Sequence, residues 1–283
     1  MSFSSIVIAG GALKVISVIG CIKYLEEHNL LNNLKNYVGS SAGNIMCLFL
    51  ILNYSYKEII EFLVHIFSDE SINNFDPNEC FNLLSEYGIS SGKNLESVLE
   101  RIIYKKLYVK DVTFMELAKI TGKNMIICVS NLTLEQSEFF NVDNMPFLSI
   151  IKAIRISCSI PLLFTPLSIN ENIYMDGGLY NNFPINYFDD TKLKDIIGIN
   201  IKFVNYKDTS NFLNYIFFLI NSLVNDKINS KNKINDNLEK NIITIEFNDD
   251  NWFSIMDLKI IFPKENWVNY INMGYNKIKE KLD

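Results

Sequence analysis

Residues 37–46 read YVGSSAGNIM, in which two serines stand between two glycines, after a short apolar approach and before an apolar run. The five residues from Gly39 to Gly43 fit the pattern G-x-S-x-G, with Ser41 at the centre. In this pattern a sharp strand-to-helix turn presents the central side chain, and the close packing two residues before and after it favours glycine. The stretch predicts a strand, a tight turn and a helix, with Ser41 as a candidate nucleophile and Ser40 as its spacer.

A second strand-turn-helix segment opens the chain. The apolar run 5–9 ends in Gly10-Gly11 and passes into a mostly apolar helical pattern over 13–25. A glycine turn that opens a helix directs successive N–H groups to one point, where they can hold an anion. The segment lacks the phosphate-binding patterns GxxxxGK[ST] and GxGxxG, and the other segment of this kind carries a serine. We therefore expect Gly10 and Gly11 to donate to an oxyanion rather than to a phosphate.

The remaining periodicity predicts strands that alternate with helices. Helical patterns cover 56–67, 93–107, 113–120, 148–157 and 263–281, and strand patterns cover 125–129, 136–140, 196–203 and 242–247. This alternation indicates an α/β fold with a largely parallel central sheet. We see no internal repeat and no domain boundary, so we expect residues 1–283 to form a single domain, with the polar stretch 225–240 as an exposed loop.

Composition narrows the functional class. The chain has 283 residues, 48% hydrophobic residues and a net charge of −6, which argues against general nucleic-acid binding. The best basic patch, Lys105, Lys106 and Lys110, is interpreted as a solvated helix end.

Five cysteines without a CxxC pair indicate a reducing compartment, and the N-terminus lacks the pattern of a signal peptide, so we expect a cytoplasmic protein.

The most apolar window, 212–224, is too short to cross a membrane. As a helix it would extend ~20 Å, against a hydrocarbon core of ~30 Å. We interpret it as a buried helix, with contact at a membrane surface as the alternative.

A serine nucleophile needs a base, and histidine is an unsuitable candidate here. His28 follows two glutamates at a predicted helix end, and His65 stands within an apolar helical pattern. Asp176, in YMDGGLYNNFP (174–184), follows an extended apolar approach and precedes Gly177-Gly178, which free the backbone to present its carboxylate at a turn. The ordinary pKa of an aspartate, ~3.9, suits a base only if the group is desolvated or acts as the proton moves. A structural Asp-Gly turn is the alternative.

Three segments in this order resemble the patatin-like phospholipase family: GGALKVISVIGCIKYLEE (10–27), GSSAG (39–43) and AIRISCSIPLLFTPLSINENIYMDGGLYNNFPI (153–185). The resemblance implies a three-layer α/β/α sandwich and hydrolysis of lipid acyl esters by a Ser-Asp dyad without histidine. It makes Ser41 the nucleophile and Asp176 the base, with oxyanion donors at Gly10 and Gly11. The matching motif positions are Gly39, Gly43, Gly177, Gly178 and Lys14, the last standing where the family has Lys or Arg.

Two positions depart from the family pattern. Ala12 replaces the third glycine, which we expect to be a mild change. Val15 replaces the glycine after the basic residue, and a positive φ there would be costly. The expected irregularity of the oxyanion turn therefore lies at Val15.

These features predict a phospholipase A-type hydrolase that needs no metal or cofactor. Its expected partner is a lipid or phospholipid at a membrane or micelle surface, reached by peripheral contact. An acyltransferase with the same dyad and a catalytically silent lipid-binding protein are the alternatives. Arg155, Ser157 and Ser159 are candidates for lining the site, and the segments 68–92 and 212–224 are candidates for acyl-chain contact.

Overall fold

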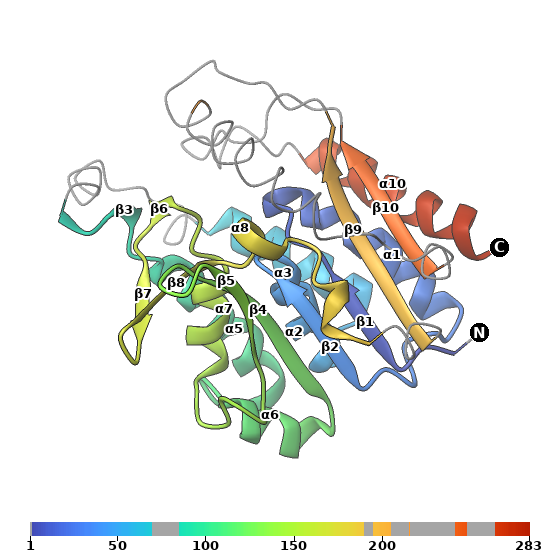
Figure 1. The fold of residues 1–283 in the computed structure, drawn as a ribbon. Helices are drawn as coiled ribbons and strands as arrows, with labels where there is room; N and C mark the ends of the chain where they lie inside the picture. Colours follow the sequence, from blue (N-terminus) through green and yellow to red (C-terminus); the bar gives the residue numbers. More distant parts are fainter. Residues whose placement is uncertain (1, 70–84, 190–194, 205–214, 216–240, 248–263) are drawn as a thin grey trace.

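A mostly parallel sheet forms the centre of the computed structural model, which describes residues 2–69, 85–189, 195–204, 215, 241–247 and 264–283 (Figure 1). Its path is β10-β9-β1-β2-β4-β8-β7, with β5 also paired to β4. The pairs among β10, β9, β1, β2 and β4 are parallel, whereas β5, β7 and β8 join antiparallel. The strands are β1 (Ser5–Ile8), β2 (Asn36–Ser40), β4 (Asn124–Asn131), β5 (Gln136–Phe140), β7 (Leu167–Ile169), β8 (Asn172–Asp176), β9 (Ile196–Phe203) and β10 (Ile242–Phe247). A separate two-stranded sheet pairs β3 (Gly88–Ser90) with β6 (Leu162–Phe164).

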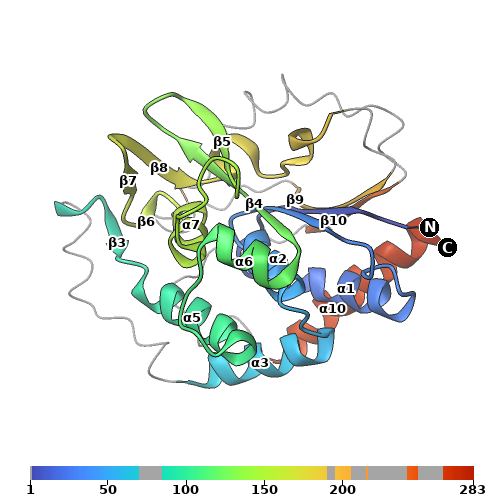
Figure 2. The same cartoon turned by 90° about the horizontal axis from the view of Figure 1, so that it is seen from below.

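Helices lie on both sides of the central sheet. Figure 2 shows α1, α2, α7 and α10 against one face, with α3 and α5 farther out, and in Figure 1 α8 lies in front of the sheet while α2, α3 and α5 lie behind it. The helices are η1 (Ala12–Ile16), α1 (Ser17–Glu27), α2 (Gly43–Ile51), α3 (Tyr56–Ser68), α5 (Lys93–Leu107), α6 (Phe114–Thr121), α7 (Ile150–Ser157), α8 (Gly178–Asn181), η3 (Ile185–Tyr187) and α10 (Lys264–Leu282). The α/β fold class with a mostly parallel sheet is thereby confirmed.

Alternate residues of the strands feed two separate hydrophobic clusters. Ile6 and Ile8 of β1 join the large cluster under the helices, whereas Val7 joins Val38 and Ile185 on the opposite face. Successive side chains of a strand point to opposite faces, so near-continuous apolar runs are required in strands covered on both sides. The residues around η3 thus form part of the second covering layer.

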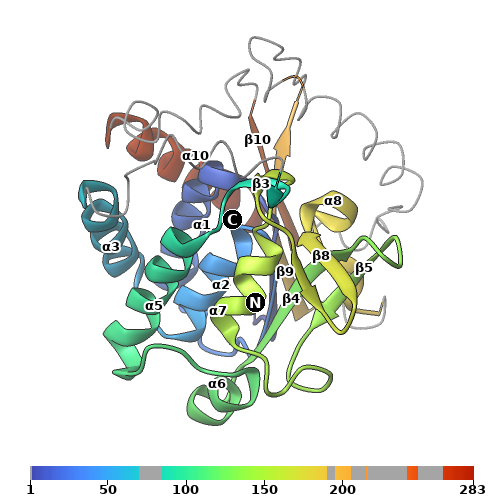
Figure 3. The ribbon, with the colours of Figure 1, turned by 90° about the vertical axis from the view of Figure 1, so that its left-hand side faces the viewer.

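Two glycines bring α1 and α10 into backbone contact. A Cβ added at Gly20 would lie 1.8 Å from the carbonyl oxygen of Ile271, and one at Gly274 would lie 1.9 Å from that of Ser17. Figures 1 and 3 show the two helices side by side. The last helix is therefore seated on the first, although they are distant in sequence.

Most predicted elements match the structure to within a few residues. The strands β5, β9 and β10 have the predicted bounds, whereas the short strands β3, β6 and β7 were not predicted. Lys105 and Lys106 lie in the last turn of α5, where Lys106 Nζ is 2.7 Å from Glu58 Oε1. The four described cysteines, Cys21, Cys47, Cys128 and Cys158, are buried free thiols.

Three predicted segments fall wholly or largely on residues that are not described. These are the candidate segment 68–92, of which 70–84 are not described, the apolar window 212–224, apart from Tyr215, and the polar stretch 225–240. Among the described helices, none combines the length and the apolar character needed to span a bilayer.

Candidate active site

The strand register brings Asp176 next to Ser41. On β4, Ile127 and Val129 both pair with β5 on one side, so β2 and β8 share the other side. Cys128 pairs with Ser40, the last residue of β2, and the next residue, Val129, pairs with Asp176, the last residue of β8. Because β8 runs antiparallel toward the end of β2, the two strand ends meet there. The serine turn and the aspartate turn are therefore neighbours.

The Ser41 turn has the geometry of a nucleophile elbow. Ser41 has φ of 48°, and α2 begins two residues later at Gly43. A Cβ at Gly39 would lie 2.5 Å from Asn44 Oδ1, and one at Gly43 would lie 2.4 Å from the carbonyl oxygen of Ile8. These approaches are too close for any side chain, so both glycines of the G-x-S-x-G pattern are needed for packing.

Ser41 and Asp176 form a direct hydrogen bond. Ser41 Oγ donates to Asp176 Oδ2 at 2.6 Å, and the backbone N–H of Gly178 donates to Asp176 Oδ1 at 2.8 Å. Burial raises the pKa of Asp176 to about 7, although both hydrogen bonds favour the charged form and lower the pKa. The carboxyl group thus gains proton affinity near neutral pH, as a general base requires.

The end of α7 contacts both halves of this pair. Ser157 Oγ accepts from the Ser41 N–H at 3.0 Å, and the carbonyl oxygens of Ser157 and Ser159 accept from Gly177 N–H at 3.2 Å and Asp176 N–H at 3.0 Å. Both serines are fully buried. Ser157 and Ser159 therefore lie at the site, where they bond to the backbone of the Ser41 turn and of the Asp176 turn.

The first glycine loop lies beside Ser41, but its first N–H is already bonded. A Cβ at Gly10 would lie 3.0 Å from Ser41 Cβ, so the loop and the elbow are in contact. Gly10 N–H donates to the carbonyl oxygen of Asn182 at 3.1 Å, and Asn182 Nδ2 donates back to Gly10 O at 3.1 Å. Among the described residues, the N–H groups of Gly11 and Ala12 have no hydrogen-bond acceptor. Because its N–H is bonded to Asn182, Gly10 is the less favourable of the two expected oxyanion donors, and Gly11 is the more favourable.

The strained position of this loop is Ala12, not Val15. Ala12 has φ of 44°, in the left-handed region, whereas Val15 lies inside η1 and is not among the residues with positive φ. The expectations for both residues were therefore wrong: the missing third glycine carries the strain, and Val15 is an ordinary core residue. Lys14 Nζ donates to Tyr270 Oη of α10 at 2.6 Å and lies over that ring, so this motif lysine packs against α10.

The histidines and Arg155 take structural positions. His28 caps α1, with Nδ1 2.8 Å from the carbonyl oxygen of Tyr24, and His65 lies exposed on α3. Arg155 is fully buried and donates to the carbonyl oxygens of Ser91 and Thr165 and to Ser159 Oγ. It therefore connects α7 to the segments at β3 and β6 instead of presenting its charge to a substrate.

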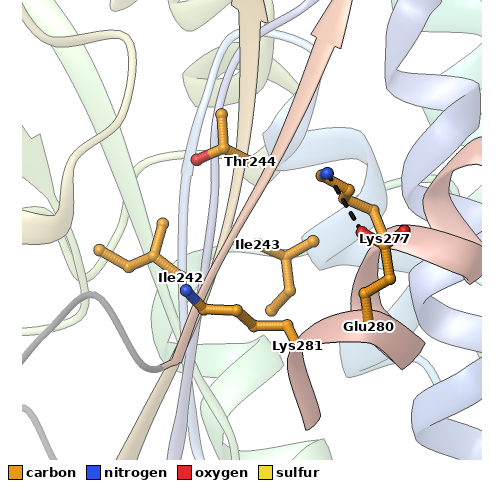
Figure 4. A pocket seen from close by; sticks show the side chains of 6 residues that line it. All are labelled: Ile242, Ile243, Thr244, Lys277, Glu280 and Lys281. Carbon is orange, nitrogen blue, oxygen red and sulfur yellow. Dashed lines mark hydrogen bonds and ion pairs between the residues drawn. The ribbon is translucent and has the colours of Figure 1, made fainter. Parts of the chain in front are cut away.

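A shallow hollow of about 260 Å³ lies elsewhere, at the sheet edge (Figure 4). It is lined by Ile242, Ile243, Thr244, Lys277, Glu280 and Lys281, from the start of β10 and the end of α10. Parallel strands carry their sites at the carboxyl ends, so this hollow is at the wrong end of the sheet for the Ser41 site. In the described part of the chain, no three His, Cys, Asp or Glu side chains gather where they could hold a metal ion.

Comparison with known families agrees with this geometry. The model of a family described as patatin-like phospholipase matches residues 6–189, which include both glycine loops, Ser41 and Asp176. The chain belongs to this family. At the level of the patatin-like phospholipase family, it is a lipid ester hydrolase.

Two relatives of this patatin-like chain are viral proteins. It is 29% identical over 212 residues to the probable lipid hydrolase 463L of Invertebrate iridescent virus 6, covering 72% of each protein. It is 27% identical over 288 residues to the uncharacterized protein R571 of Acanthamoeba polyphaga mimivirus, covering 98% of this chain and 93% of that one. The crystal structure of VipD from Legionella pneumophila shares the fold with a TM-score of 0.60 at 17% identity, over 99% of this chain and 67% of that one.

Proposed function

We propose that this chain hydrolyses fatty-acyl esters of phospholipids, with Ser41 as the nucleophile and Asp176 as the base. The observation that carries the proposal is the 2.6 Å hydrogen bond from Ser41 Oγ to a buried carboxylate whose pKa is raised to about 7. At neutral pH this carboxylate is partly ionised and basic enough to accept the serine proton as the bond forms. The proposed substrate is a phospholipid presented by a membrane or micelle.

The reaction would run in two stages. Ser41 Oγ attacks the ester carbonyl carbon while its proton passes to Asp176, and the carbonyl oxygen becomes an oxyanion. When this intermediate collapses, the bond to the leaving alcohol breaks and Asp176 returns the proton to the alcohol oxygen. Water then attacks the acyl-enzyme, Asp176 takes its proton, and the fatty acid leaves as the proton returns to Ser41.

The donors for the oxyanion would be the N–H groups of Gly11 and Ala12. They follow Gly10, which lies against Ser41, and among the described residues both lack acceptors. Each such donor contributes ~3 kcal/mol to transition-state stabilisation, or ~10²- to 10³-fold in rate. A weak base such as aspartate relies on this contribution.

The test is hydrolysis of phosphatidylcholine vesicles by the purified protein, with fatty acid and lysophospholipid followed by mass spectrometry. The Ser41→Ala variant should lose hydrolysis and labelling by a fluorophosphonate, because no attacking oxygen remains. The matched control is Ser40→Ala, which removes the neighbouring hydroxyl, a buried group that bonds to no described residue. It should keep both activities.

Three outcomes would contradict the proposal in different ways. Hydrolysis retained by Ser41→Ala would remove Ser41 from the mechanism. Wild-type protein that neither hydrolyses lipid nor reacts with the fluorophosphonate would be a silent lipid-binding protein. Acyl transfer to an added alcohol in place of water would make it an acyltransferase.

A further inference from the structure

The hydroxyl of Ser157 uses its full hydrogen-bonding capacity beside the elbow. It accepts from Ser41 N–H at 3.0 Å and from Asn44 Nδ2 at 2.9 Å, and it donates to the carbonyl oxygen of Cys128 at 2.6 Å. A serine hydroxyl offers one donor and two acceptor positions, so none remains for a substrate. The group is fully buried, and its contacts join α7, β4 and the start of α2.

Ser41 needs such support because its backbone conformation is unfavourable. A φ of 48° places a residue with a Cβ in the left-handed region, where it stays only if its surroundings hold it. The Ser157 hydroxyl accepts from the N–H of Ser41, at the nitrogen end of the N–Cα bond whose torsion is φ. It therefore restrains the torsion that sets the direction of Ser41 Oγ.

The backbone at the end of α7 and just after it, at Ser157 and Ser159, bonds to the aspartate turn. Ser157 O accepts from Gly177 N–H at 3.2 Å, and Ser159 O accepts from Asp176 N–H at 3.0 Å. One short turn thus bonds to both the serine elbow and the aspartate turn. The distance between Ser41 and Asp176 depends on this turn, and Ser157 supplies the side-chain part of it.

We propose that Ser157 is a positioning residue for the reaction, whose hydroxyl holds the backbone of Ser41 so that Ser41 Oγ stays in line with Asp176. The proposal rests on the proposed function of Ser41 and Asp176. Ser157 acts through Ser41 and does not touch the reacting atoms.

The test compares Ser157→Ala with wild type on a soluble p-nitrophenyl ester. Removal of the hydroxyl leaves the Ser41 N–H without its acceptor, and a displacement of about 1 Å in a reacting group costs about 10²-fold. We expect kcat to fall about 10- to 100-fold with little change in KM. Ser157→Thr, which keeps the hydroxyl, should recover most of the rate.

Ser149→Ala is the matched control for loosening of α7. Ser149 caps the opposite end of the same helix, where its Oγ accepts from Lys152 N–H at 3.0 Å. Its removal should lower the melting temperature, as losing a cap does, and leave kcat and the pH profile unchanged. The amount of active enzyme in each sample is fixed by fluorophosphonate titration.

The pH profile separates positioning from general loss of structure. The hydrogen bond from Ser41 lowers the pKa of Asp176, so displacement of Ser41 should move the acid limb of kcat/KM to higher pH. The thiols that face Asp176, Cys128 from β4 and Cys158 immediately after α7, stay neutral because burial raises the pKa of each. The limb should move in Ser157→Ala and stay in place in Ser157→Thr and Ser149→Ala.

Each result has a distinct meaning. Inactive wild-type protein would refute the proposed function itself. Active wild type with an unchanged kcat per titrated site in Ser157→Ala would overturn the role of Ser157 and leave the dyad standing. If Ser157→Ala lowered kcat without moving the acid limb, and Ser157→Thr did not recover the rate, Ser157 would contribute only to packing and the positioning role would be refuted.

Discussion

Asp176, the proposed base, is a buried carboxyl group whose ionised form is unfavourable. Burial raises the pKa of its carboxyl group from 3.8 to about 7, so the folded protein binds the proton more tightly than the unfolded chain does. Folded-state stability is therefore lost as pH rises from about 4 through 7, where the buried carboxylate ionises. The proposed base is thus a group whose ionised form destabilises the folded protein.

The variant Asp176→Asn should be inactive and more stable than wild type in alkaline solution. It removes a buried charge worth on the order of a few kcal/mol, so we expect its melting temperature to exceed that of wild type by roughly 5 °C at pH 8. The difference should be nearly closed at about pH 4, where the wild-type carboxyl group is protonated in the folded protein and roughly half protonated in the unfolded chain. Hydrolysis should fall by at least about 10²-fold.

The control for this prediction is Asp143→Asn, which removes an exposed carboxylate. It should change neither the melting temperature nor the rate. An Asp176→Asn variant that is equally destabilised at pH 4 and pH 8 would show that the carboxylate is needed for packing and carries no ionisation penalty.

Local chemistry made some residues of the site predictable and hid others. The close packing expected of Gly39 and Gly43 is present, since a Cβ at either position would lie within 2.5 Å of other atoms. Gly177 was expected to free the backbone, but its φ of −59° is ordinary, and it is required because a Cβ there would lie 2.3 Å from the carbonyl oxygen of Cys128. The bonding of Gly10 to Asn182 depends on where a distant segment packs, and the asparagines of that segment have no pattern in the sequence that marks this contact. Ala12 did stand out as a replaced glycine, but its positive φ follows from the path of the backbone, which the sequence alone does not give.

At the scale of elements, length decided what the sequence could predict. Strands such as β9 and β10 carry long runs of branched apolar residues and were predicted with correct bounds. The strands β3, β6 and β7 have three residues each, too few for any periodicity to register. These strands form because other strands pair with them in the tertiary structure. The sequence of one short segment does not show which partner it will have.

The contact between α1 and α10 provides a test of element packing. Gly274→Ala would place a methyl group 1.9 Å from the carbonyl oxygen of Ser17, so the helices must separate. Forcing extra atoms into a packed contact costs about 1–3 kcal/mol, and we expect the melting temperature to fall by roughly 5 °C. Thermal unfolding followed by circular dichroism measures this.

Asn276→Ala, on an exposed position of the same helix, is the control. Alanine favours helix there and should leave the melting temperature unchanged or slightly higher. If Gly274→Ala behaved in the same way, the two helices would not be in backbone contact.

At the scale of the whole molecule, the glycine loop depends on strands beyond the matched family segment. The match ends at residue 189, yet β9 pairs with β1 inside the sheet, between β1 and β10. Ala9 N–H donates to Ile199 O at 2.9 Å, and a Cβ at Gly11 would lie 2.6 Å from Ile201 Cδ1. The loop that precedes η1 is thus built against β9.

A chain truncated to residues 1–189 should therefore fail to fold, even though it keeps Ser41 and Asp176. It would leave β1 as an edge strand, expose the core face of α1 that α10 covers, and remove the support of the glycine loop. We expect no cooperative thermal transition and no fluorophosphonate labelling, whereas residues 1–283 should show both. The Ser41→Ala variant of residues 1–283 is the control, because it should unfold cooperatively without labelling. Cooperative unfolding with labelling of the truncated chain would instead show that the first 189 residues are a domain of their own, since the site would then have assembled without β9, β10 and α10.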